Sequence, residues 1–243
     1  MYSLVDIAPT IAGILHISMP RRDGAAIPEV IKELDKCGKL ILIIVDGFGL
    51  SIYERYKYYF NFRGMVFKCR GVSMHTTPSI ATILTGLHPE NHRVFETKDT
   101  YNSEGLSIVE LASMQGIRSS VIMEKMGARS FQDSVDMVVE IEEEDAVQYD
   151  YMVRNALIRQ TKKAAFTVAH FRILDRFYHS NGNTEMAVEI LSTHLKDIAA
   201  CSKNAGIIIC GDHPPHNEEN NDVPLIALSV SVHTPVGVNL IFL

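Results

Sequence analysis

Carboxylate and imidazole side chains follow three short apolar runs of the sequence. Asp46 ends "KLILIIVD", Asp175 ends "FTVAHFRILD" with His179 four residues later, and Asp212 and His213 end "GIIICGDH". An Asp after a buried strand is more often a turn residue than a ligand. If these oxygen and nitrogen donors converge, however, they suit two borderline divalent ions such as Zn²⁺ or Mn²⁺. The three runs therefore predict a metal centre.

Two hydroxyl groups precede a predicted helix. In "HTTPSIATILTG" (75–86), Pro78 is typical of a first helical turn and Gly86 of a helix end. A threonine at such a position is usually a simple N-cap. The free backbone N–H groups of a helix start favour an anion, and a hydroxyl beside two metal ions is an activated nucleophile. Thr76 and Thr77 thus indicate phosphoryl transfer.

The apolar runs predict strands, and helical patterns lie between them. We expect an α/β fold with a mostly parallel central sheet and helices on both faces. In such sheets ligands gather beyond the carboxyl ends of the strands, so the donors should meet at one edge. The predicted strands span 39–49, 119–123, 135–141, 166–175 and 206–213, and helical patterns include 78–86 and 184–206.

The composition is that of an ordinary globular chain. Of the 243 residues, 47% are hydrophobic and 21% are charged, which suits one large domain with a real core. The net charge of −6 argues against a nucleic-acid surface. No apolar run reaches the ~20 residues of a membrane helix, and the four cysteines lack metal-type spacing. We expect a cytoplasmic protein with reduced thiols and no membrane partner.

The motifs and their order resemble the alkaline phosphatase superfamily, nearest its type I phosphodiesterase/nucleotide pyrophosphatase branch. "ILIIVDGFG" is similar to the first metal motif of that superfamily, and "TTPSIATILTGLHPENH" to its nucleophile motif. "ILDRFYH" resembles the middle Asp-x-x-x-His pair, and "GDH" followed by "VPLIAL" the late Asp-His motif and the next strand. The resemblance covers 39–228. It implies a two-metal hydrolase of small phosphate esters, such as nucleotides.

The resemblance also implies roles for individual residues. Thr76, two residues before Pro78, matches the nucleophile, and Thr77 takes a variable position that contacts substrate. Ser79 stands where the branch often has an Asn that contacts the phosphoryl group. One metal ion would be held by Asp46, Thr76, Asp212 and His213.

The second metal ion would be held by Asp175, His179 and one more histidine. His216 precedes the "VPLIAL" strand, as the last histidine of the family often does. His233, in "SVHTPVG", is the rival ligand, although an ordinary turn residue is typical there. The resemblance favours His216.

Other functions compatible with the motifs remain as alternatives. A phosphomutase of the cofactor-independent phosphoglycerate mutase type shares the superfamily, but it inserts a large second domain between the nucleophile and the middle motif. A sulfatase needs a modified Cys or Ser where this chain has Thr76. The non-enzymatic alternative is a member that binds metal or nucleotide without turnover, which the short loop after His213 would suit.

The segment 1–38 is out of place in the family order. "LVDIAPTIAGILHISMPRRDG" (4–24) resembles the stretch that usually follows the last strand, yet it precedes the first metal motif here. We expect a single circularly permuted domain over 1–243, with 1–38 as the C-terminal-type segment and linker and 39–243 as the metal-binding core. A helix capped by Asp6 should then pack beside strand 223–228. The alternatives are a generic amphipathic helix, or one that docks on a partner subunit in a homo-oligomer.

Overall fold

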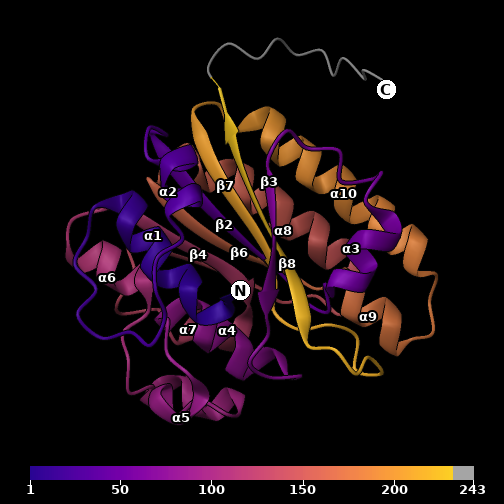
Figure 1. Cartoon of the computed structure of the whole chain (residues 1–243), viewed down its shortest axis with the longest axis horizontal. Coiled ribbons are helices and arrows are strands. Elements are labelled where there is room, and N and C mark those ends of the chain that lie inside the picture. The colour runs from indigo at the N-terminus through magenta and orange to yellow at the C-terminus, as the bar shows by residue number, and fades with distance from the viewer. Residues whose placement is uncertain (232–243) are drawn as a thin grey trace.

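The central strand of the fold is β2 (Lys39–Val45), the first apolar run of the sequence analysis. It pairs in parallel with β6 (Phe166–Phe171) on one side and with β7 (Ala205–Gly211) on the other. The computed structural model describes residues 1–231, and these pairings form the middle of its sheet (Figure 1). Val45 lies opposite both Phe171 and Gly211 in register. The three strands therefore end level, and the residues that follow them meet at one edge.

The whole sheet of the described residues has the order β1-β3-β8-β7-β2-β6-β4-β5. All neighbouring pairs are parallel except those made by β8, which runs antiparallel to both β3 and β7. The expected α/β fold with a mostly parallel sheet is thus confirmed. The outer strands are β1 (Tyr2–Ser3), β3 (Met65–Arg70), β4 (Ser119–Glu124), β5 (Met137–Ile141) and β8 (Asp222–Val230).

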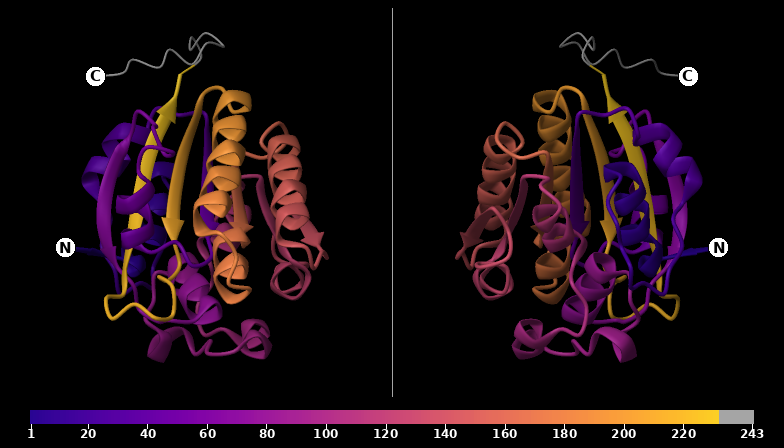
Figure 2. Two further views of the ribbon diagram at one scale, coloured as in Figure 1. Left: turned by 90° about the vertical axis from the view of Figure 1, so that its right-hand side faces the viewer. Right: turned by 90° about the vertical axis from the view of Figure 1, so that its left-hand side faces the viewer.

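Helices cover both faces of the sheet, as Figure 2 shows from two sides. Alternate residues of β2 point to opposite faces, and each set belongs to a separate buried cluster. On one face lie α1 (Ile7–Leu15), α2 (Pro28–Leu34), α4 (Thr76–Thr85), α6 (Ile108–Met114) and α7 (Lys125–Arg129). On the other lie α3 (Leu50–Tyr56), α8 (Ala146–Gln160), α9 (Ile173–His179) and α10 (Thr184–Cys201). No helix of the described residues is long and apolar enough to cross a membrane.

The N-terminal segment is built into this fold. Helix α1 shares a buried cluster with the β8 residues Val223, Leu225 and Ala227, and α2 contacts β8 directly. The helix near Asp6 therefore packs on the face of the sheet to which alternate residues of strand 223–228 point, and α2 is the nearer neighbour of that strand. The circular permutation itself stays a prediction.

Asp6 acts differently from the simple helix cap that the sequence suggests. It precedes α1, but its side chain makes no hydrogen bond to the start of that helix. Instead, its two carboxylate oxygens accept the backbone N–H groups of Ser3 and Ala25, each at 2.8 Å. Asp6 thus joins the first residues of the chain to the loop that follows α1.

Gly24 is the closest point of that loop to the first turn of the chain, and we predict that Gly24→Ala destabilises the protein. An added Cβ would lie 2.1 Å from the carbonyl oxygen of Val5, which is backbone and cannot turn away. We expect a loss of about 1–3 kcal/mol in the free energy of unfolding, measured in urea. Ala26→Ser, at an exposed neighbouring position, should change it by less than about 0.5 kcal/mol. Equal effects of the two substitutions would show that this loop is not docked.

Candidate metal centre

A first group of ligand-type side chains lies where β2 and β7 end. Asp46 follows β2, Asp212 and His213 follow β7, and one donor atom of each lies within 4.8 Å of the others. All three are buried, at 2%, 0% and 0% exposure. The N–H of Gly47 donates to Asp212 Oδ1 at 3.1 Å, which fixes the carboxylate between the two strand ends.

The tautomer of His213 follows from its backbone contact. Its Nδ1 lies 2.8 Å from the carbonyl oxygen of Pro214, which can only accept, so Nδ1 carries a hydrogen. The other ring nitrogen, Nε2, faces Asp46 Oδ1 at 3.2 Å. A backbone carbonyl that orients a histidine ring in this way is the usual support of a metal ligand.

The buried charges of this group perturb one another. Burial and the nearby Asp46 carboxylate raise the pKa of Asp212 to about 8. Burial opposes the charged form of His213, but a hydrogen bond to Asp46 and the charge of Asp212 raise its pKa to about 9. Burial also opposes ionisation of Asp46, yet His213, His170 and Arg172 lower its pKa. Without a cation, the group retains protons that a divalent ion would displace.

A second group lies beside the first. Asp175 and His179 are one turn apart on α9, with Asp175 Oδ1 3.4 Å from His179 Nε2, and His216 Nε2 lies 3.9 Å from the same oxygen. Burial and the charge of Asp46 raise the pKa of Asp175. The ring of His216 stacks on that of His213 at 4.9 Å between centroids, so the two groups are adjacent.

The chemistry of these donors fits two divalent ions. Within residues 1–231, Asp212 Oδ2 and Asp175 Oδ1 are buried and have no hydrogen-bond partner, one in each group. A buried carboxylate oxygen without a partner is costly. A cation in each group would satisfy both oxygens, and the mixed nitrogen and oxygen donors suit Zn²⁺ or Mn²⁺.

The hydroxyl of Thr76 reaches the first group. At the start of α4, Thr76 Oγ1 donates to Asp46 Oδ1 at 3.1 Å and lies 3.2 Å from His213 Nε2. Thr77 faces away from these donors, and its hydroxyl lies 3.3 Å from that of Thr97. The Oγ of Ser79 donates to the carbonyl oxygen of Ser73, and the expected contact of Ser79 with the phosphoryl group stays a prediction. The rival ligand His233 lies outside the described residues.

Two further residues of the site, His170 and Arg172, lie within an apolar run and belong to none of the motifs of the sequence analysis. His170, near the end of β6, is 2% exposed, and its Nε2 lies 3.9 Å from Asp46 Oδ2. The guanidinium of Arg172, just beyond β6, has Nε 3.7 Å from the same oxygen. The backbone N–H of Arg172 donates to the buried carboxylate of Asp150 on α8 at 2.8 Å. Their position at the carboxyl end of a predicted strand is the signal that could identify them.

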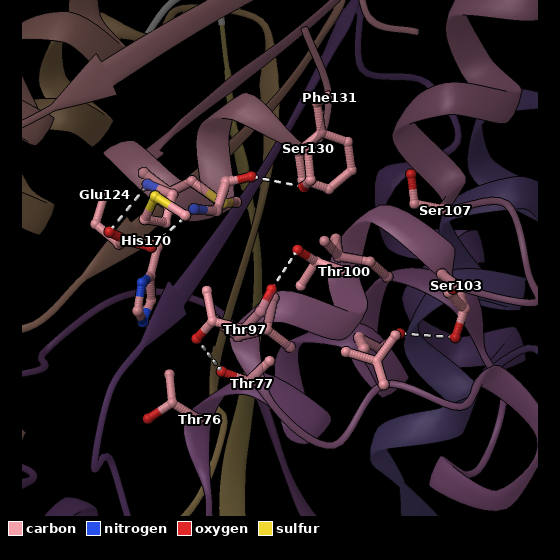
Figure 3. A pocket seen from close by; sticks show the side chains of 18 of the residues that line it. Thr76, Thr77, Thr97, Thr100, Ser103, Ser107, Glu124, Ser130, Phe131 and His170 are labelled. Atoms are coloured by element: carbon pink, nitrogen blue, oxygen red, sulfur yellow. Dashed lines mark hydrogen bonds between the residues drawn. The ribbon is translucent and has the colours of Figure 1, made fainter.

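A pocket of about 790 Å³ opens beside Thr76 (Figure 3). It is lined by Thr76, Thr77, His170 and Arg172, and it continues along α4 under the short helix η2 (Thr97–Asn102) and α7. The nucleophile candidate therefore lies at the wall of a cavity large enough for a small molecule.

Comparisons with known proteins show the fold. No protein-family model matches the chain, and no curated protein matches its sequence. Phosphonoacetate hydrolase from Sinorhizobium meliloti 1021 superposes with a TM-score of 0.61 and 13% identity, over 74% of this chain and 57% of that one. An alkaline phosphatase superfamily protein from Vibrio parahaemolyticus superposes with a TM-score of 0.62 and 13% identity, over 94% of this chain and 69% of that one.

A third solved structure agrees with these two. Murine ectonucleotide pyrophosphatase/phosphodiesterase 5 superposes with a TM-score of 0.58 and 16% identity, over 72% of this chain and 57% of that one. The chain thus has the alkaline phosphatase superfamily fold. It spans little more than half the length of the phosphonoacetate hydrolase and of the murine protein.

We predict that His216→Ala removes one of two bound metal ions, whereas His233→Ala does not. His216 faces Asp175 and His179, and an imidazole nitrogen must reach about 2.0–2.1 Å from zinc to bind it. Native mass spectrometry and elemental analysis of both variants count the metal. A His216→Ala protein with two ions beside a His233→Ala protein with one would reverse the assignment.

His92, the last residue of the short helix α5 (Pro89–His92), links this helix to α4. Its Nδ1 accepts the N–H of Val94 at 3.0 Å, so its Nε2 carries the hydrogen and donates to Thr82 Oγ1 at 3.1 Å. The side chain is fully buried, and burial lowers its pKa to about 4. His92 is therefore a neutral structural residue of the nucleophile motif.

The lowered pKa of His92 predicts a loss of stability in mild acid. The unfolded chain takes up this proton near pH 6.5, whereas the folded protein resists it until about pH 4, so the free energy of unfolding falls as the pH drops below 6.5. In His92→Gln, whose amide can keep both hydrogen bonds, the loss between pH 7 and pH 5 should be smaller by about 1–2 kcal/mol. Urea unfolding of both metal-free proteins measures it, and equal losses would contradict the assignment.

Proposed function

We propose that this protein is a metal-dependent phosphohydrolase or phosphodiesterase with Thr76 as its nucleophile. The observation that carries the proposal is the position of Thr76 Oγ1, 3.1 Å from Asp46 and 3.2 Å from His213, at the start of a helix. A hydroxyl among ligand-type donors, beside free backbone N–H groups and a cavity, suits attack on a phosphate ester.

The metal ligands of the proposed enzyme are the two groups of the candidate site. Asp46, Thr76, Asp212 and His213 would hold one divalent ion, and Asp175, His179 and His216 the other. Zn²⁺ or Mn²⁺ is the proposed ion for both. When bound, the two ions supply positive charge for the attacking and leaving oxygens of an in-line displacement.

The reaction proceeds by two displacements at phosphorus. Thr76 Oγ1 forms a bond to phosphorus while the ester P–O bond breaks, and the alcohol leaves with a proton. Water then attacks the phosphothreonine, which returns the hydroxyl of Thr76 and releases phosphate, or a phosphate monoester from a diester. In the resting site, Asp46 Oδ1 accepts a hydrogen bond from the hydroxyl of Thr76. This bond turns the lone pairs of the Thr76 oxygen away from Asp46.

The guanidinium of Arg172 supplies positive charge from the protein, in addition to that of the proposed metal ions. Its guanidinium is 25% exposed at the pocket wall and lies 5.6 Å from the ring centre of Tyr149, which supports it. An arginine there can donate hydrogen bonds to phosphoryl oxygens that develop charge during the reaction. We assign Arg172 that role.

The packing between the nucleophile and the middle motif supports a hydrolase over a phosphomutase. The elements α6, β4, α7, β5 and α8 lie in this interval, and all of them pack in or on the same sheet. A large inserted domain, which the phosphomutase resemblance requires, has no place among them. The substrate is accordingly proposed to be a small phosphate ester.

We predict that Thr76→Ala abolishes hydrolysis of p-nitrophenyl phosphate and bis-p-nitrophenyl phosphate, while Thr77→Ala retains most of it. Thr76 supplies the attacking oxygen, whereas the Thr77 hydroxyl contacts only Thr97 among the described residues. Metal content, counted by mass spectrometry, should fall little in either variant. Mass spectrometry of acid-quenched wild type should also find phosphate on Thr76. If Thr76→Ala stayed active and Thr77→Ala lost activity, the nucleophile would be Thr77 and not Thr76.

A further inference from the structure

The pocket beside Thr76 has cations at one end only. Among the described residues that line it, the positive side chains are Arg172 and Arg176. The N–H of Arg176 donates to the carbonyl of Arg172 at 3.1 Å, so both belong to the same turn at the start of α9. Because Arg172 lies beside Asp46, this turn is at the metal end. The positive charge of the pocket is thus placed for one phosphoryl group.

Two carboxylates also line the pocket, that of Glu124 beside His170 (Figure 3) and that of Glu110 on α6, and both are already hydrogen-bonded. Glu124, at the end of β4, accepts the backbone N–H groups of Gly127 at 2.7 Å and Met126 at 3.1 Å. Glu110 on α6 accepts both the N–H and the hydroxyl of Ser107 at 2.8 Å. A second phosphate or a carboxylate that extends along α4 toward Glu110 would meet that carboxylate, and the arginines that line the pocket are at the other end, on α9.

Three hydroxyl groups of the pocket wall donate to nearby backbone carbonyl groups. Thr85 donates to the carbonyl of Ala81 at 2.7 Å, Thr100 to that of Thr97 at 2.7 Å, and Ser130 to that of Gly127 at 2.7 Å. A hydroxyl engaged in this way has no hydrogen left to donate to a ligand. Figure 3 shows Thr100 and Ser130 with these bonds on the walls of the pocket. The surface offered to a ligand is therefore more apolar than the residue types suggest.

Large apolar side chains surround the opening of the pocket. Tyr101, Leu106 and Met126 line it and yet remain 51%, 48% and 46% exposed to solvent. They come from three separate segments, η2, the loop before α6, and α7. Exposed apolar residues that converge on one opening mark a binding surface rather than chance exposure.

From these four features we infer that the substrate is a phosphate ester with a single phosphoryl group and a bulky, uncharged, largely apolar organic group. The inference rests on the proposed function, because Thr76 and the arginines place the phosphoryl group at one end. The organic group then extends along α4 under η2 and α7. Nucleoside diphosphates and triphosphates are disfavoured, because their further phosphates would approach Glu110 in the part of the pocket where no described residue supplies a cation.

The test compares three aryl phosphates whose phenols have similar acidity. These are phenyl phosphate, 2-naphthyl phosphate and 4-carboxyphenyl phosphate, each assayed with the Zn²⁺ and the Mn²⁺ protein. The naphthyl ester should have a kcat/KM about tenfold above that of the phenyl ester, because it buries a second ring. The carboxyphenyl ester should fall about tenfold below the phenyl ester. ATP should be a poorer substrate than any neutral ester.

Two pairs of variants locate the effect in the pocket. Leu106→Lys places a cation at the opening and should bring the carboxyphenyl ester to within about twofold of the phenyl ester. Met114→Lys makes the same change at an exposed position of α6 that does not line the pocket, and should leave the ratios unchanged. Ala81→Phe fills the wall along α4 and should remove the preference for naphthyl over phenyl. Ala25→Phe, at an exposed position away from the pocket, is its control.

Binding separates this inference from the proposed function. Calorimetry with 2-naphthylmethylphosphonate, a non-ester probe, against methylphosphonate measures the same preference without turnover. If no ester is cleaved with either metal, the proposed function fails, and the binding ratio still decides whether the pocket is apolar. If all esters are cleaved with equal kcat/KM, or if ATP or the carboxyphenyl ester is preferred, the inference is wrong while the hydrolase stands.

Discussion

The candidate site depends on the close packing of the chain segments that carry its donors. At three glycines this packing leaves no room for a side chain. A Cβ at Gly211, the last residue of β7, would lie 2.0 Å from the carbonyl oxygen of Phe48. A Cβ at Gly49 would lie 2.7 Å from Pro214. Gly47 has a φ of +72°, and its Cβ would lie 3.1 Å from that of Asp175. The segments that carry the donors therefore pack on one another through bare backbone.

This close approach explains the charge of the site. Asp46 lies more than a hundred residues before Asp175 and Asp212 in the sequence, yet the glycines let the three segments meet without intervening side chains. Burial, and after it repulsion from the Asp46 carboxylate, raises the pKa values of Asp175 and Asp212. The fold brings them together through the pairing of β2 with β6 and β7, and the repulsion is what a divalent cation would relieve.

The sequence predicts the centre of the sheet better than its edge. Strands β2, β6 and β7 are mostly apolar and buried, because parallel strands that are covered on both faces need largely apolar side chains. Strand β3 is not predictable in this way, because exposed residues alternate with more buried ones and it contains Lys68 and Arg70. Strand β8 is expected from its resemblance to a known motif, but nothing in its residues indicates that it runs antiparallel.

The candidate site shows the same division. Donors that directly follow an apolar run are predictable, because the carboxyl ends of parallel strands meet. His170 and Arg172 are hidden, because they lie within or just after such a run and resemble occasional polar residues of a buried strand. The role of Ser79 rests on motif matching alone, since its Oγ donates to the carbonyl oxygen of Ser73 in the structure. The pocket beyond Thr76 depends on how η2 and α7 pack over α4, which no local pattern of residues encodes.

The antiparallel strand β8 also determines the order in which the sheet can close. It is the last described strand of the chain, yet it lies between β7 and β3 and is the only link between the short β1-β3 edge and the rest of the described sheet. During synthesis from the N-terminus, more than 150 residues follow β3 before its partner strand β8 is made. The apolar faces of α1 and α2 also lack β8 until then. Contacts of such long sequence separation form late and slowly. Until then, the N-terminal third of the chain exposes an apolar surface and an unpaired strand edge, which are the features that chaperones bind and that aggregation exploits.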